Sequence, residues 1–231
     1  MRRLGSLLAL LLALALPACG GEDEGPDEVR IGDEPASSAP TLVAALGDSI
    51  TAGTPLWDPA PAIRRRIGQV DPESQYAYWV QLRLKGTRFR NCGVPGERTD
   101  EIAARLERCA KGADVLIVQG GINDIAQARD VGAAAEDLRS MVKRGRELGL
   151  RVALVELLPW NNGYPAAAPA VRELNRLIGG IGRELEVPVY PWYEQLEDPR
   201  APGRMKREWT SDGDHPSVAG YRRLARTVEL P

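Results

Sequence analysis

From residue 41 onward, the chain alternates short apolar runs with longer segments in which apolar residues recur at helical spacing. This alternation is typical of βαβ units, in which parallel strands form one sheet and helices cover its faces. It therefore predicts an α/β domain over residues 41–231. The predicted strands are 42–46, 87–91, 115–119, 151–157 and 187–190, and the predicted helices are 75–85, 99–110, 132–148, 169–185 and 216–228.

The first nineteen residues have the pattern of an export signal. Arg2 and Arg3 precede the apolar run 7–16, which is too short for a membrane span of about 20 residues but suits a signal peptide. The run leads into Leu-Pro-Ala-Cys, which resembles the bacterial lipoprotein cleavage site, where the cysteine carries the lipid. We therefore expect a lipid anchor at Cys19 and a place on a bacterial membrane, outside the cytoplasm. The alternatives, a plain secretory peptide or a short hydrophobic anchor, also export the protein.

Residues 20–40 are rich in acidic residues, Gly, Pro and Ser, a composition that cannot bury enough apolar surface to order itself. We interpret this segment as a disordered acidic tether. Without it, residues 41–231 carry only a slight excess of Lys and Arg, which gives no sign of a nucleic-acid-binding face. One histidine and three scattered cysteines exclude a His-rich metal enzyme, and we predict neither a metal nor a cofactor.

The first predicted strand is followed by Gly47-Asp48-Ser49-Ile50. A serine at a strand end can expose its hydroxyl where the next helix begins, and backbone N–H groups there can hold a developing oxyanion. Taken alone, the tripeptide is weak evidence, because Ser or Asp at this place can simply cap a helix. The nucleophile elbow G-x-S-x-G is not met, since Thr51 stands where its second glycine belongs. The common α/β-hydrolase fold is therefore disfavoured.

Three more polar blocks follow the other strands or precede the last helix. They are Asn91-Cys92-Gly93-Val94-Pro95-Gly96, Gly121-Ile122-Asn123-Asp124 and Asp212-Gly213-Asp214-His215-Pro216. Ligands of an open parallel sheet bind beyond the carboxyl ends of its strands, so we expect these blocks to meet at one edge. Serine, histidine, aspartate and a side-chain amide form the set that acyl transfer requires.

In these four blocks, and in their order, the sequence resembles the GDSL or SGNH hydrolase family. The resemblance spans nearly all of residues 41–228, and no block residue departs from the family pattern. It implies a flavodoxin-like three-layer α/β/α sandwich with five parallel strands in the order 2-1-3-4-5. It also implies that Ser49 is the nucleophile, His215 the general base and Asp212 the residue that orients the imidazole. The oxyanion hole would consist of the N–H groups of Ser49 and Gly96 and the side-chain amide of Asn123.

The residues themselves support these roles and leave alternatives open. Only His215 can take the serine proton, because the chain has no other histidine, although it could also be a packing residue at a helix start. Asp214 competes with Asp212, but a neighbour of the histidine is less able to fold back onto its ring. Asn123 could cap a loop, and Gly93 and Gly96 could both be turn glycines that need positive φ.

Long predicted loops at 53–74, 159–168 and 191–211 are expected to line the site and to set its specificity. Six aromatic residues lie in or beside them, and some are expected to wall the substrate groove. They are Trp57, Trp160, Tyr164, Trp192, Tyr193 and Trp209.

Cys92 and Cys109 could form a disulfide in an exported protein. A single helix over 99–110 would, however, place them about 15 Å apart along its axis. The bridge therefore requires that this helix be short or tilted.

We interpret the chain as a serine ester hydrolase that acts through an acyl-enzyme, outside the cytoplasm, on small acyl esters or lipids. An alternative is a carbohydrate O-acetylesterase on envelope or extracellular glycans. A catalytically silent glycan- or lipid-binding protein is a third reading, against which the intact Ser49, Asp212, His215 and Asn123 argue. The sequence does not indicate acyl length, the alcohol part of the substrate or the oligomeric state.

Overall fold

The computed structural model describes residues 39–231. The predicted signal peptide, the expected lipidation site Cys19 and all but the last two residues of the predicted tether lie outside the described residues. Within residues 39–231, no helix is long and apolar enough to span a membrane.

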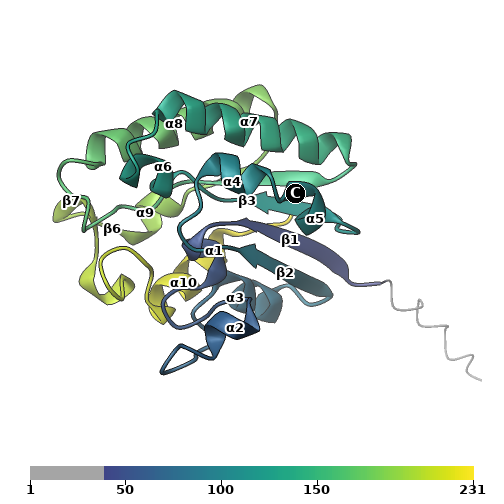
Figure 1. Cartoon of the computed structure of the whole chain (residues 1–231), viewed down its shortest axis with the longest axis horizontal. Helices are drawn as coiled ribbons and strands as arrows, with labels where there is room; N and C mark the ends of the chain where they lie inside the picture. Colours follow the sequence, from purple (N-terminus) through teal and green to yellow (C-terminus); the bar gives the residue numbers. More distant parts are fainter. Residues whose placement is uncertain (1–38) are drawn as a thin grey trace, which may run out of the picture. The chain divides into compact units, whose positions relative to one another are not determined.

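One five-stranded parallel sheet forms the middle layer, in the predicted order β2-β1-β3-β4-β5 (Figure 1). Its strands are β1 Thr41–Gly47, β2 Thr87–Gly93, β3 Val115–Val118, β4 Arg151–Val155 and β5 Val189–Tyr190. In the register, Gly47 of β1 lies beside Gly93 of β2, and Leu46 lies beside Val118 of β3. The carboxyl ends of β2, β1 and β3 are therefore level, which brings the loops that follow them to one edge.

Helices cover both faces of the sheet. The helices that pack on it over the two buried clusters include α3 Tyr76–Arg83, α4 Thr99–Ala103, α5 Leu106–Ala110, α7 Val131–Glu147, α8 Ala168–Glu184 and α10 Val218–Leu224. The remaining elements are α1 Ser49–Ala52, α2 Pro61–Arg64, α6 Ile122–Ala126, α9 Trp192–Leu196, a hairpin of β6 Glu197–Asp198 and β7 Ala201–Met205, and 3₁₀ turns at Arg207–Trp209 and Ala225–Thr227. In Figure 1, α7 and α8 lie along the top of the molecule, and α3 and α10 lie below the sheet.

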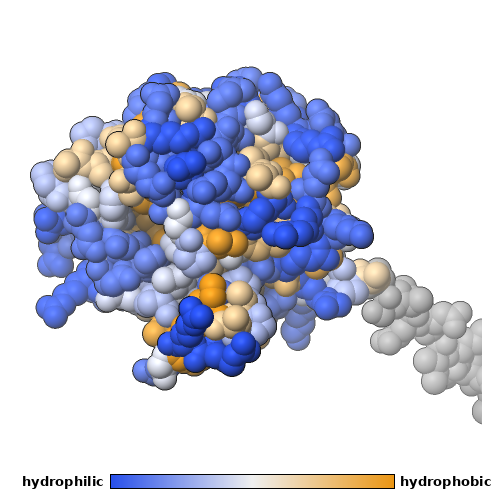
Figure 2. Space-filling model, in the orientation of Figure 1, coloured by the Kyte–Doolittle hydropathy of each residue, from blue (hydrophilic) through white to orange (hydrophobic). Residues whose placement is uncertain are grey.

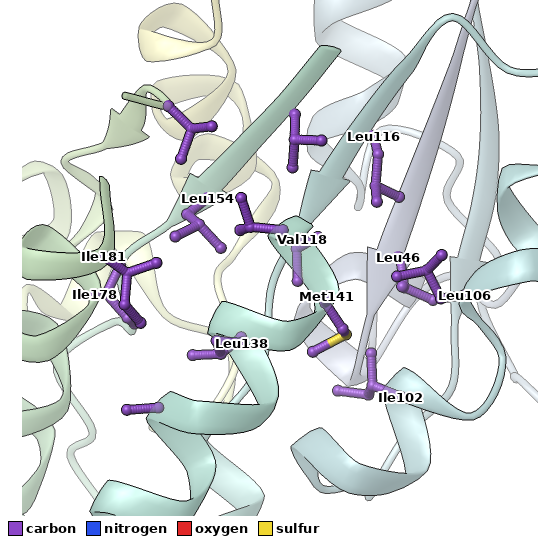
Figure 3. Close-up of a cluster of buried hydrophobic side chains, with 14 of the residues drawn as sticks. Leu46, Ile102, Leu106, Leu116, Val118, Leu138, Met141, Leu154, Ile178 and Ile181 are labelled. Carbon is purple, nitrogen blue, oxygen red and sulfur yellow. The ribbon is translucent and has the colours of Figure 1, made fainter. Parts of the chain in front are cut away.

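Strand residues alternate between two buried clusters, as the two-residue period of a strand requires. Ala44 and Leu46 face the cluster under α4, α5, α7 and α8, whereas Val43 and Ala45 face the cluster under α3, α9 and α10. Burial on both faces explains why the strands read as continuous aliphatic runs. Figure 3 shows the first cluster, with labelled side chains Leu46, Ile102, Leu106, Leu116, Val118, Leu138, Met141, Leu154, Ile178 and Ile181.

The face of the molecule drawn in Figure 2 is mainly hydrophilic. Figure 2 shows mostly hydrophilic residues over the outer faces of α7 and α8, and an apolar group at the lower edge of the molecule near α2. Ile63 of α2 and Val70 after it are both partly exposed, at 43% and 46%.

The predicted helix over 99–110 is wrong as a single element, and its division explains the disulfide. The chain forms α4 and then α5, with Ala104 and Arg105 between them. α5 is thus a separate short helix, and its Cys109 forms a disulfide with Cys92, with the Cα atoms 6.1 Å apart. The condition for the bridge, that the helix be short or tilted, is met because the single helix is replaced by two short ones. Closing a loop of this length stabilises the folded protein by about 3 kcal/mol in the chain-entropy model.

Other predicted boundaries also shift. The helix expected from Pro216 begins at Val218, because Pro216 instead pairs with Thr210 in an isolated bridge. The helix gives way to a 3₁₀ turn at Ala225. The strand expected over 151–157 ends at Val155. The loop expected over 191–211 contains α9 and the β6-β7 hairpin, which the sequence analysis missed.

Candidate active site

Ser49 opens α1 directly after β1 ends. The Asp48 carboxylate caps this short helix by accepting a hydrogen bond of 2.9 Å from the Ile50 N–H. The first N–H groups of a helix have no partner within it, so the Ser49 N–H remains free of helical bonding. Ser49 is 7% exposed, which leaves its hydroxyl at the bottom of a cleft.

The glycines of the first two blocks allow α1 to lie close to the sheet. A Cβ atom on Gly47 would lie 2.3 Å from Thr51 Oγ1, and one on Gly93 would lie 2.1 Å from the Ala52 nitrogen. Gly93 is therefore required for close packing and not for a turn, which corrects the sequence-based alternative. Gly96 does have a positive φ, of +84°, as that alternative proposed.

Asp212, His215 and Ser49 form a continuous hydrogen-bonded chain. His215 Nδ1 lies 2.8 Å from Asp212 Oδ2, and His215 Nε2 lies 3.0 Å from Ser49 Oγ. A carboxylate only accepts hydrogen bonds, so Nδ1 carries the proton and Nε2 is the nitrogen that can accept from serine. The competing carboxylate, Asp214, instead accepts a hydrogen bond from the Trp160 indole.

The surroundings of Asp212 keep its carboxyl ionised. Partial burial raises its pKa, but hydrogen bonds from the His215 ring and from the backbone N–H groups of His215 and Asp214 outweigh this effect and hold the pKa below its usual value. The same backbone bonds, of 2.8 Å and 2.9 Å, fold the turn so that residue 212 faces the ring of residue 215. Asp212 therefore stabilises a proton on the imidazole.

Asn123 and Gly96 are joined through the residue after the glycine. The Asn123 amide nitrogen donates a hydrogen bond of 2.9 Å to the Glu97 carbonyl oxygen, and Gln127 donates one of 3.2 Å to the Gly96 carbonyl oxygen. An amide nitrogen has two hydrogens, so one orients Asn123 and the second is available to the cleft that Asn123 lines. Gly96 is not a lining residue of this cleft; it belongs to the loop that these side chains hold in place.

Two supporting groups were missed by the sequence analysis. Gln119, just after β3, donates a hydrogen bond of 3.0 Å to Asp48 Oδ2 and accepts one of 2.9 Å from Thr51 Oγ1. It therefore fixes both ends of α1 to the neighbouring strand. A polar residue at the end of an otherwise aliphatic run was the available signal.

The second group is centred on Asp124, the residue after Asn123. Asp124 is fully buried and accepts hydrogen bonds from the backbone N–H and the hydroxyl of Thr99, at 3.0 Å and 2.9 Å. Arg129 forms ion pairs with Asp124 at 2.6 Å and with Asp137 at 2.7 Å. This network connects the helix that carries Asn123 to the start of α4, which follows the loop of Gly96.

Burial raises the pKa of Asp48 to about 6, although hydrogen bonds from the Ile50 N–H and the Gln119 amide act in the opposite direction. The folded protein therefore takes up a proton at higher pH than the unfolded chain does. The contribution of Asp48 to the free energy of unfolding should rise as pH falls from about 6 to 4, by about 3 kcal/mol at most.

Denaturant unfolding of the wild type and of Asp48→Asn across this pH range measures that contribution. The wild type should gain stability relative to the variant as the pH falls, because the variant has no carboxyl at residue 48. Parallel curves for the two proteins would show that Asp48 is not the titrating group.

The cleft above Ser49 has a volume of about 220 Å³. Its lining residues are Ser49, Ile50, Ile122, Asn123, Ala126, Trp160, Asp214 and His215. Of the three loops expected to line the site, 159–168 contributes Trp160, whereas 53–74 and 191–211 contribute none of these residues. Trp160 is likewise the one member of the six loop aromatics on this list.

The sequence model of the GDSL-like Lipase/Acylhydrolase family matches residues 45–223. The chain belongs to this family, and it is a carboxylic ester hydrolase. A comparison with curated proteins gave no match.

Solved structures share the fold at low sequence identity. A protein assigned to the lipolytic G-D-S-L family from Desulfitobacterium hafniense has a TM-score of 0.67 and 17% identity, over 81% of this chain and 97% of its own. A G-D-S-L family member from Veillonella parvula gives 0.65 and 20%, over 81% and 95%. A GDSL-like lipase from Bacteroides thetaiotaomicron gives 0.64 and 18%, over 81% and 85%. These likenesses show the fold.

Proposed function

We propose that this ester hydrolase acts through an acyl-enzyme on Ser49, with His215 as general base and Asp212 as the residue that orients and stabilises the imidazole. The observation that supports this most is the hydrogen-bonded chain from Asp212 through His215 to Ser49, with distances of 2.8 Å and 3.0 Å. Serine is a weak nucleophile until a base removes its proton, and this chain supplies the base. The same geometry argues against a catalytically silent binding protein.

The reaction then proceeds in two halves. The Ser49 hydroxyl gives its proton to His215 Nε2 as its oxygen bonds to the ester carbon. The carbonyl oxygen becomes an oxyanion that accepts hydrogen bonds from the Ser49 and Gly96 N–H groups and from the Asn123 amide. The tetrahedral intermediate collapses, and the alcohol leaves with the proton from His215. Water then gives a proton to the same imidazole as its oxygen bonds to the acyl carbon. His215 returns this proton to Ser49 Oγ as the bond between that oxygen and the acyl carbon breaks, and the acid leaves.

A volume of about 220 Å³ lies below the usual range of roughly 300 to 1,000 Å³ for ligand pockets. The cleft therefore suits an ester with a small acyl group better than a long-chain lipid. O-acetyl esters of envelope or extracellular glycans meet this requirement, and we retain them as the second candidate substrates.

Labelling with a fluorophosphonate tests the assignment of the nucleophile. The reagent phosphonylates an activated serine, so peptide mass spectrometry should find the added mass on the peptide that contains Ser49. Ser49→Ala should abolish the label, and His215→Ala should slow it by several orders of magnitude because the serine is no longer activated. A label on another serine, or equal labelling in His215→Ala, would contradict the proposal.

We further propose that the protein is lipid-anchored outside the cytoplasm through Cys19. The support is the sequence alone: an apolar run after two arginines, followed by Leu-Pro-Ala-Cys. Mass spectrometry of the mature protein from its native membrane should find an N-terminal Cys19 that carries a diacylglyceryl group. Cys19→Ser should lack this modification and leave the membrane fraction. An unmodified amino terminus at another residue in the wild type would contradict the anchor.

A further inference from the structure

The catalytic cleft is adjacent to a second, much smaller cavity. This inner cavity has a volume of about 20 Å³, which is room for roughly a single water molecule. Ile50, Ile122, Trp160 and Asp214 line both the inner cavity and the cleft. The two spaces therefore meet at these four residues, which we call the partition.

The walls of the inner cavity are mostly apolar. Besides the shared residues, they are Gln119, Glu156, Leu157, Leu158, Pro159 and Trp192. The space behind the partition thus has the chemistry to accept hydrocarbon but not the volume. Its small size depends on the side chains that close it.

Trp160 is the largest member of the partition, and both its edge and its face are held. The indole Nε1 donates a hydrogen bond of 2.5 Å to Asp214 Oδ1. The ring also lies on Gly163, where a Cβ atom would come within 2.2 Å of Trp160 Cε3. A tryptophan that is restrained on two sides is a rigid wall.

The two residues that follow Trp160 are joined to the catalytic turn as well. The Asn161 N–H donates a hydrogen bond of 3.0 Å to the Gly213 carbonyl oxygen, and the Asn162 side-chain amide donates one of 3.0 Å to the Asp212 carbonyl oxygen. The loop that carries Trp160 is therefore tied to the turn that carries Asp212 and His215. The wall keeps a fixed position relative to the catalytic residues.

We propose that the Trp160 indole, held by Asp214 and Gly163, is the stop that restricts the substrate to short acyl groups. This inference rests on the proposed function of Ser49. The leaving alcohol must lie beside His215 Nε2, which protonates it, and the oxyanion must face Asn123. The acyl chain is left with the apolar part of the cleft, formed by Ile50, Ile122 and Trp160, and it meets the indole.

A chain-length series of p-nitrophenyl esters, from acetate through butyrate and hexanoate to octanoate, tests the stop. In the wild type, kcat/KM should fall by tenfold or more between butyrate and octanoate. Trp160→Ala should join the cleft to the inner cavity and raise the octanoate-to-acetate ratio of kcat/KM by about 10- to 100-fold. This is the effect of burying about one or two more methylenes, at about tenfold each. Trp160→Leu should give a smaller rise of the same sign.

Trp57→Ala is the matched control, because Trp57 packs against Arg64 and lines neither space. Its chain-length profile should equal that of the wild type. Thermal unfolding of every variant shows whether the protein is folded, and Trp160→Leu keeps the test valid if Trp160→Ala does not fold.

A second series, with acetyl held constant and phenyl, p-nitrophenyl and naphthyl alcohols, separates acyl from alcohol recognition. The ratios within this series should change less than threefold in Trp160→Ala. A larger change here than in the acyl series would overturn the assignment of the wall to the acyl group. Unchanged acyl profiles in folded, acetate-hydrolysing variants, or a wild type that prefers octanoate, would also overturn it. Absence of Ser49-dependent hydrolysis of every ester would instead refute the proposed function.

Discussion

Ser49→Ala and His215→Ala should each lower kcat/KM for p-nitrophenyl acetate by about 10⁴- to 10⁶-fold, and the double variant should be no worse than either single variant. The two residues share one proton transfer across the 3.0 Å contact between Nε2 and Oγ. Once either is lost, the other has no function left to lose. Steady-state kinetics on the four purified proteins measures this lack of additivity.

Two control measurements accompany this test. Active-site titration must exclude traces of wild-type enzyme, because a residual rate of one part in 10⁴ is otherwise ambiguous. The thermal midpoints should stay close to that of the wild type, since both side chains lie at the cleft and not in either buried cluster. Losses that multiply in the double variant would mean that the two residues act in separate steps.

Asn123→Ala should lower kcat by about 10²- to 10³-fold and leave KM nearly unchanged, because the bond to the oxyanion forms only as negative charge develops. The sequence suggested that Asn123 is either an oxyanion donor or a structural residue. The hydrogen bond to the Glu97 carbonyl gives the same amide a structural contact, so the variant should also lose about 1 kcal/mol of stability.

Comparing kcat with the thermal midpoint separates the two effects, and Asn123→Asp, which also loses the bond to the Glu97 carbonyl, gives a second variant for this comparison. It keeps the size of the side chain but replaces both amide hydrogens with a carboxylate that repels the oxyanion, so its kcat should fall at least as far as that of Asn123→Ala. Kinetics and the thermal midpoint are measured on the same samples. A lowered midpoint with unchanged kcat in the folded fraction would remove Asn123 from the oxyanion hole.

The sheet could be predicted from the sequence because its strands are buried on both faces. Continuous aliphatic runs such as 115–119 identify strands of this kind, and the resemblance of the polar blocks supplied their order. The break within 99–110 could not be predicted, because its cause is tertiary. Arg105, at the break, donates hydrogen bonds to the carbonyl oxygens of Cys92 and Gly47 and pairs with Glu97, and no local residue pattern shows those partners.

The catalytic residues could be predicted from the sequence because they are chemically distinctive residues that follow predicted strands or precede the last predicted helix. The choice of Asp212 over Asp214 followed from the geometry of a turn, and the structure places Asp212 against the imidazole. The hydrogen bond between Trp160 and Asp214 could not be predicted, because the two residues are far apart in the sequence and neither belongs to a spacing pattern. Residues that shape specificity therefore emerged only from the packing of one loop against another.

The two glycines under the nucleophile have a consequence for altering this enzyme. Gly47 and Gly93 leave no room for even one methyl group between α1 and the sheet, so the backbone below Ser49 has a single permitted position. The floor of the cleft therefore cannot be remodelled without displacing the serine. The wall at Trp160 is formed by side chains on a loop, and a substitution there leaves that floor untouched. Changes of substrate preference, by selection or by engineering, should therefore accumulate in the wall and spare the floor.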